Sequence, residues 1–140
     1  MVVGCRLSVV GCLKRNMKDT KKDYTDLEVW QECRKLTNHV YEFSKAFPKD
    51  ELFGLTNQIR RSAVSIPSNI AEGCGRSTSK DTLHFLHIAR GSLYEVETQT
   101  FVALDQNYIT KETFDSLFET VQRCKRLLNG FINYYRKLND

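Results

Sequence analysis

Residue types that could ligate a metal gather at one place in this 140-residue chain. Asp81, His84 and His87 are three residues apart, so a helix would carry all three on one side, where they could bind a divalent cation. A metal enzyme built from helices needs further ligands from other helices, such as a second Glu-x-x-His motif with two more glutamates. The sequence contains no such set. We therefore expect no metal and no cofactor, and we expect solvated histidines on a helix.

The cysteines offer no catalytic group either. Five cysteines without a Cys-x-x-Cys pair indicate neither a disulfide framework nor a zinc ribbon, and they favour a reducing compartment. Cys33 and Cys124 lie on apolar stripes that are typical of a core. Cys74 stands between two glycines, where we expect exposure, but no base nearby could activate its thiol. Because no nucleophile, base and orienting group can be assembled, we expect no enzyme activity.

Anion binding is the one chemistry that the sequence supports. Arg76 and Lys80 flank three hydroxyl residues at the start of an expected helix, where backbone N–H groups suit a phosphate, although ordinary capping explains the hydroxyls equally well. Arg123 and Arg126 share a polar face of the last expected helix, in the late position that the helix dipole favours. The candidate contacts to nucleic-acid phosphates are Arg60, Arg61, Arg76, Lys80, Arg123 and Arg126.

Charge is concentrated at the start of the chain. Residues 1–23 contain six basic and two acidic residues, which is the whole formal charge of +4, and the rest of the chain carries 15 residues of each sign. A basic arm can attract nucleic acid or can simply be a solvated terminus. We expect residues 1–23 to form a disordered basic extension, with Met17 as a second candidate initiator, and residues 24–140 to form one domain.

Four apolar stripes with alternating steps of three and four residues predict four helices. The expected helices span about 26–47, 51–72, 79–105 and 111–138, and their stripes run from Val29 to Phe47, Leu52 to Ile70, Leu86 to Ala103 and Phe114 to Leu138. The short connections force antiparallel neighbours. We therefore predict an all-α, antiparallel up-down-up-down four-helix bundle. No apolar run approaches the ~20 residues that a membrane span needs.

Two polar features interrupt this pattern. Pro67 lies in the middle of the second helix, so we predict a kink there that leaves the helix continuous, and we expect Ser65, Ser68 or Asn69 to bond the carbonyl of Ala63 that proline leaves unpaired. Glu97 flanks the stripe of the third helix. A carboxylate beside a core needs a partner, and Arg60, Arg61 or Arg90 could form a structural ion pair with it.

Long motifs in three of the helices resemble one protein family. The run from Gln58 to Gly73, QIRRSAVSIPSNIAEG, resembles the characteristic segment of the 23S rRNA intervening-sequence proteins, a family of small bacterial four-helix bundles. Asp26-Leu27-x-x-Trp30, Phe47-Pro48, Phe53-Gly54-Leu55 and the pattern from Phe85 to Gln99 also match. The resemblance covers about residues 24–138 and leaves residues 1–23 outside.

The resemblance implies a cytoplasmic bundle without enzyme activity, often assembled as a homopentameric ring. A related protein, the accessory variability factor of diversity-generating retroelements, binds nucleic acid and a reverse transcriptase through a basic barrel. The present chain departs from that protein because its bundle region is neutral overall. We expect a self-assembling bundle that binds RNA or DNA, or a nucleic-acid enzyme such as a reverse transcriptase, without a membrane. The alternative is a protein-interaction scaffold with no nucleic-acid contact.

Overall fold

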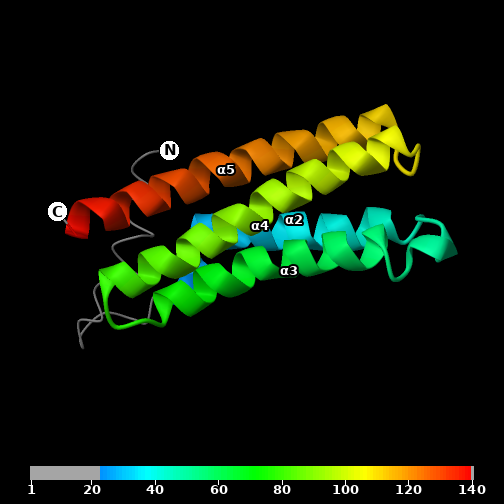
Figure 1. Ribbon diagram of the computed structural model, residues 1–140. Coiled ribbons are helices and arrows are strands. Elements are labelled where there is room, and N and C mark those ends of the chain that lie inside the picture. The colour runs from blue at the N-terminus through cyan, green and yellow to red at the C-terminus, as the bar shows by residue number, and fades with distance from the viewer. Residues whose placement is uncertain (1–22, 140) are drawn as a thin grey trace.

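The computed structural model describes residues 23–139, and this part of the chain forms a bundle of four long helices (Figure 1). The elements, in chain order, are the 3-10 turn η1 (Tyr24–Asp26), α2 (Glu28–Ser44), the 3-10 turn η2 (Lys49–Glu51), α3 (Leu55–Cys74), α4 (Ser79–Asp105) and α5 (Lys111–Asn139). The predicted basic extension lies outside the described residues except for Asp23. The Asp23 side chain caps η1 by accepting a hydrogen bond from the Tyr24 N–H, so Asp23 belongs to the folded region.

Successive helices run in opposite directions, and α2 and α4 each lie between α3 and α5 (Figure 1). This arrangement confirms the predicted all-α four-helix bundle. One end of the bundle carries η2 and the α4–α5 connection, and we call it the η2 end. The other end carries the turn from α3 into α4, and we call it the α3–α4 turn end.

The helices differ in length, which leaves part of the bundle with fewer layers. α2 has 17 residues and α5 has 29, or roughly 25 and 43 Å at 1.5 Å per residue. Arg123, near the middle of α5, pairs with Glu28 at the start of α2. The second half of α5 therefore continues past α2 toward the α3–α4 turn end, beside the first half of α4 (Figure 1).

The predicted stripes form the core, with Phe43 and Leu55 half-buried against it and two residues exposed. Every stripe residue of α4 from Leu86 to Ala103 is buried, and α3 buries Ile59, Ala63, Ile66 and Ile70 completely. Leu52 is 54% exposed because it precedes α3 in the turn after η2, and Leu138 is 49% exposed in the last turn of α5. Across residues 23–139, no helix combines the length and apolarity needed to cross a bilayer.

Helix α3 passes through Pro67 without ending, which confirms the predicted continuity. Proline lacks an N–H, so the carbonyl of Ala63 loses its helical donor. The predicted donors are wrong: the hydroxyl of Thr37 on α2 lies 2.9 Å from the Ala63 carbonyl oxygen and the same distance from the carbonyl of Cys33. A buried threonine of the neighbouring helix thus bonds the carbonyl that the proline leaves without a donor.

The seam between α3 and α4 depends on small residues. A Cβ on Gly73 would lie 3.2 Å from the carbonyl oxygen of Thr82, and the Thr82 hydroxyl donates to the Gly73 carbonyl at 2.8 Å. Farther along the same two helices, the hydroxyls of Ser65 and Ser92 lie 2.8 Å apart. Small side chains therefore let these two backbones approach closely. Gly91 of α4 takes no part in this close approach, because an added Cβ there would meet nothing within 4 Å.

Candidate nucleic-acid interface

The six predicted cations do not form one patch. Arg60 and Arg61 lie in the first half of α3, Arg76 and Lys80 lie at the α3–α4 turn end, and Arg123 and Arg126 lie near the middle of α5. Three of the six are engaged by other side chains of the bundle. The set therefore divides into cations that hold the fold together and cations that are available to a ligand.

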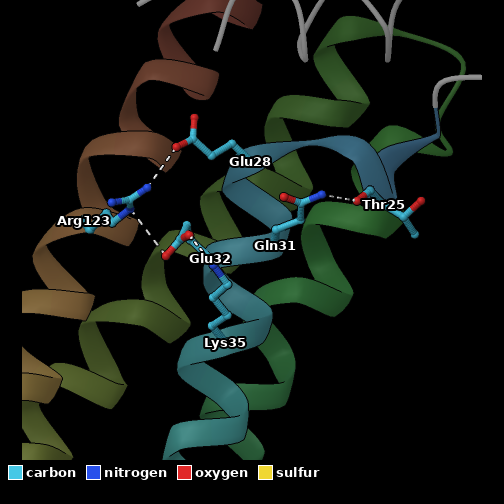
Figure 2. A network of polar contacts seen from close by, with 6 residues as sticks. All are labelled: Thr25, Glu28, Gln31, Glu32, Lys35 and Arg123. Carbon is cyan, nitrogen blue, oxygen red and sulfur yellow. Dashed lines mark hydrogen bonds and ion pairs between the residues drawn. The ribbon is translucent and has the colours of Figure 1, made fainter. Parts of the chain in front are cut away.

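Arg123 joins α5 to α2 (Figure 2). Its guanidinium lies 3.1 Å from a carboxylate oxygen of Glu28 and 3.4 Å from one of Glu32, whose side chain is only 12% exposed. Lys35 holds the other oxygen of Glu32 at 3.0 Å. Because both acids face Arg123 from a neighbouring helix, its charge is compensated within the bundle, and we interpret it as a structural residue.

Arg60 and Arg76 also have partners. The Arg60 Nε donates to the Ser44 hydroxyl at 2.8 Å, and its guanidinium lies over the Tyr41 ring. Arg76 pairs with Glu72 one turn earlier at 2.7 Å and covers the ring of Phe85. The predicted phosphate site before α4 is weakened further, because the Thr78 hydroxyl already accepts from the Asp81 N–H as the helix cap.

The other three predicted cations are exposed. Arg61, Lys80 and Arg126 make no ion pair with any acid among residues 23–139. They lie on three different helices, so they do not form a common site by themselves.

Glu97 forms the predicted structural ion pair, but with a partner from the other side. Lys125 of α5 lies 2.9 Å from one Glu97 oxygen and 3.2 Å from the other, and the Gln122 amide donates at 2.8 Å. The predicted partners Arg60, Arg61 and Arg90 are therefore wrong. The Lys125 ammonium also lies over the ring of Tyr94.

Sequence reasoning missed a basic surface where the first half of α4 meets the second half of α5. The basic half, as we define it, comprises Thr82–Tyr94 and Thr120–Asn139, and the acidic half comprises Glu95–Asp105 and Lys111–Glu119. The basic half has no acid and carries Arg90, Arg123, Lys125, Arg126, Arg136 and Lys137. The acidic half has a single lysine, Lys111, and carries Glu95, Glu97, Asp105, Glu112, Asp115 and Glu119.

Arg90 connects the two helices of the basic half. Its guanidinium donates to the Asn129 side-chain oxygen of α5 at 3.3 Å and lies 3.2 Å from the Nδ1 of His87. Partial burial, helped by the charges of Arg90, Arg136 and His84, lowers the pKa of His87. Cations from both helices therefore raise the local potential around one imidazole. The signal was visible in the sequence as two acid-free stretches, but only antiparallel packing brings them to the same end.

Neither a metal-ligand cluster nor an ionised thiol is found in the part of the chain that the structure describes. No group of three or more His, Cys, Asp or Glu side chains within residues 23–139 could hold a metal ion. Cys33 and Cys124 are both buried, as predicted, and the Cys124 thiol together with burial raises the pKa of Cys33 well above its ordinary value. A thiol that resists ionisation is a poor nucleophile.

Comparison with known proteins gives this architecture a family. Residues 25–130 match the family described as 23S rRNA-intervening sequence protein. Among solved structures, the chain is similar to a protein with unknown function from the S23 ribosomal protein family of Bacteroides thetaiotaomicron, with a TM-score of 0.69, 25% identity, and coverage of 74% of this chain and 97% of that chain. No curated protein matches the chain. The chain belongs to the family of 23S rRNA-intervening sequence proteins.

Proposed function

We propose that this chain is a non-enzymatic, self-assembling bundle that binds structured nucleic acid or a nucleic-acid enzyme such as a reverse transcriptase. A homopentameric ring in the cytoplasm is the form we expect. The buried thiols of Cys33 and Cys124, which are not joined in a disulfide, suit a reducing compartment. A protein-interaction scaffold without nucleic-acid contact remains the alternative.

One observation carries the self-assembly part of the proposal. Leu52 and Phe53, at the tip of the connection between α2 and α3, are 54% and 90% exposed. A phenylalanine that projects almost entirely into water gains nothing for the monomer, whereas apolar side chains in this position anchor protein contacts. Of the other aromatic residues outside the stripes, Tyr41, Tyr94 and Phe118 are exposed too, while Phe85 and Tyr134 are half-buried.

A second apolar surface lies at the same η2 end. Phe101 of α4 packs against Phe114 and Phe118 of α5 with ring centroids 4.9 and 6.1 Å apart. Phe101 and Phe118 remain 43% and 37% exposed, and Val102 beside them is 40% exposed. The projecting Leu52 and Phe53 and the apolar face around Phe101 are two different surfaces of one chain. A heterologous interface joins two different surfaces, and contacts of this kind give a ring when the rotation between subunits closes.

Light scattering on the full chain tests self-assembly. We expect a species several times the 16.3 kDa of one chain at micromolar concentration, and we expect Phe53→Ser to reduce it toward the monomer. Val64→Ser is the matched control, because Val64 is 41% exposed on α3 and outside both apolar surfaces. A 16 kDa species for the unaltered chain would contradict self-assembly.

A salt titration of binding to a structured RNA separates the two functional alternatives. A nucleic-acid binder should bind at ~50 mM salt and weaken as salt rises, because phosphate contacts release counterions. Absence of binding by the full chain at that salt would remove the nucleic-acid proposal and favour the scaffold.

A further inference from the structure

We propose that the basic half of the α4–α5 face is the nucleic-acid contact, and that Arg90, His87 and Arg136 bind the phosphate backbone of one strand with Asn129 beside them. This inference rests on the proposed function and assigns it a surface. Of the six predicted cations, Arg123 and Arg126 lie in this basic half, and of these two only Arg126 has no acid partner among the described residues.

Helix dipoles do not explain the division of charge. On α5, acids come first and bases last, which is the order that the dipole favours. Helix α4 follows that order only at Asp81 in its first turn; beyond it the order is reversed, with Arg90 in the first half, Glu95 and Glu97 in the second half and Asp105 in the last turn. Its final turn contains no basic residue. The same sign of charge therefore collects at the same end of both helices, so the pattern belongs to the surface they share.

The cations of this surface retain donors for a ligand. A guanidinium has five N–H donors, and the contacts of Arg90 with Asn129 and His87 use two of them. Arg90, Arg126, Arg136 and Lys137 have no ion pair with an acid in the described part of the chain. His84, His87 and Arg90 climb α4 in steps of roughly 4.5 Å, which gives a row of donors along the helix.

The backbone of this surface is open as well. Gly91 of α4 and Gly130 of α5 both lie in the basic half, and an added Cβ at either would meet nothing within 4 Å. A glycine in the interior of an exposed helix lowers stability without improving internal packing. Close approach of a ligand to the helix backbone accounts for both positions.

A second copy of the chain is the rival occupant, since its acidic half would complement this surface. Cores of protein interfaces are depleted of charged residues, whereas nucleic-acid interfaces are polar and strongly positive. The exposed phenylalanines Phe53, Phe101 and Phe118 lie at the η2 end, whereas the basic half exposes Ile88, Tyr94 and Leu138, and the Lys125 ammonium lies over the Tyr94 ring. The observations therefore favour phosphate for the basic half.

The test compares the full chain with Arg90→Gln/Arg136→Gln in binding to a fluorescent RNA stem-loop. We expect the variant to bind roughly tenfold to a hundredfold more weakly, and the slope of log affinity against log salt to fall by about two units. The matched control is Lys45→Gln/Lys111→Gln, which removes the same charge from exposed side chains at the η2 end. Circular dichroism checks that both variants are helical.

Each other outcome overturns the inference. Unchanged binding by Arg90→Gln/Arg136→Gln would show that the RNA binds elsewhere while leaving the proposed function intact. Equal losses of RNA affinity in both variants would show that the net charge of the chain, and not the position of the basic residues, determines binding. A change in oligomer size with RNA affinity preserved would assign the surface to a second copy. Absence of RNA binding by the unaltered chain would remove both the proposed nucleic-acid function and its surface.

Discussion

The acidic and basic halves of the α4–α5 face are built from the same two helices and pack on the same continuous core, yet their surfaces differ in kind. The acidic half combines six carboxylates with the exposed rings of Phe101 and Phe118. The basic half has guanidinium, imidazole and amide groups and the open glycines Gly91 and Gly130, beside the exposed side chains of Ile88, Tyr94 and Leu138. Because both halves belong to the same two helices, we interpret the difference as a consequence of what each surface meets.

A second lesson comes from the cations within the basic half. Arg123 and Lys125 are held by acids at 2.9–3.4 Å, whereas Arg126 and Arg136 are not (Figure 2 shows Arg123). Held cations fix α5 against its neighbours. The others leave a positive potential that the bundle does not neutralise, so counting basic residues alone overestimates a binding surface.

Exchanging charge between the halves should have the largest effect. Arg90→Glu/Arg136→Glu removes four units of charge, and Glu112→Lys/Glu119→Lys restores four, so the combined variant keeps the formal +4. If location decides, the combined variant should bind the RNA stem-loop at least about a hundredfold more weakly, because like charge repels phosphate where it must approach. Fluorescence anisotropy measures this, and full binding by the combined variant would show that net charge suffices.

Arg123 and Arg126 should separate stability from binding. Arg123→Gln removes the link to Glu28 and Glu32, so we expect the free energy of unfolding to fall by about 1 kcal/mol, a value limited by solvent screening of partly exposed pairs. RNA affinity should stay nearly constant. Arg126→Gln should give the reverse result, with unchanged stability and a salt slope lower by about one unit. Urea melts and salt titrations on both variants check the split.

The pH dependence should have opposite signs for stability and for binding. Burial, Arg90 and Arg136 lower the pKa of His87 from its ordinary 6.5, so the folded chain holds fewer protons than the unfolded chain just below that pH. The contribution of His87 to stability is full above pH 6.5 and declines as the pH falls. Phosphate near His87 offsets the repulsion from Arg90, Arg136 and His84, so RNA affinity should rise as the pH falls through the same interval.

Binding and urea melts between pH 7.5 and 5.5 test this relation. His87→Gln should reduce both trends and His84→Gln/His87→Gln should reduce them further, because both imidazoles are exposed in the same row along α4. Parallel trends in stability and affinity would contradict the assignment of His87 to the ligand surface.

The open glycines should give the smallest effect. Gly91→Ala and Gly130→Ala should each raise the free energy of unfolding by about 0.5 kcal/mol, because alanine restricts the unfolded chain and meets no obstacle in the helix. If a ligand approaches the backbone there, both changes should weaken RNA binding although they stabilise the fold. Gly73→Ala is the contrast, since its Cβ would press on Thr82 and should destabilise.

Sequence periodicity predicted the helices well, because the core face of a helix follows from its apolar spacing. The expected third helix, 79–105, matches the observed bounds of α4. Periodicity does not tell on which flank the next helix lies, since a bundle can turn with either hand. That ambiguity explains why Arg60 and Arg61 of α3, beside Arg90 of α4 itself, were the predicted partners of Glu97 when Lys125 of α5 holds it, and why Thr37 of α2 was missed at Ala63.

The candidate site was less predictable for the same reason. Arg60, Arg76 and Arg123 looked available in the sequence because their partners Ser44, Glu72 and Glu28 become neighbours only after the helices form and pack. Only Arg126 belongs to both the predicted set and the basic half without an acid partner. A division of charge along an antiparallel pair becomes visible once the two helices are laid side by side.

The close seam between Gly73 and Thr82 has a consequence for the order of folding. Their hydrogen bond spans only nine residues, so the loop it closes costs little entropy compared with the α2–α5 contact between Glu28 and Arg123, which spans 95. Contacts of short sequence separation favour rapid structure formation. We expect the hairpin of α3 and α4 to form early, with substitutions at Gly73 slowing folding and substitutions at Arg123 mainly accelerating unfolding.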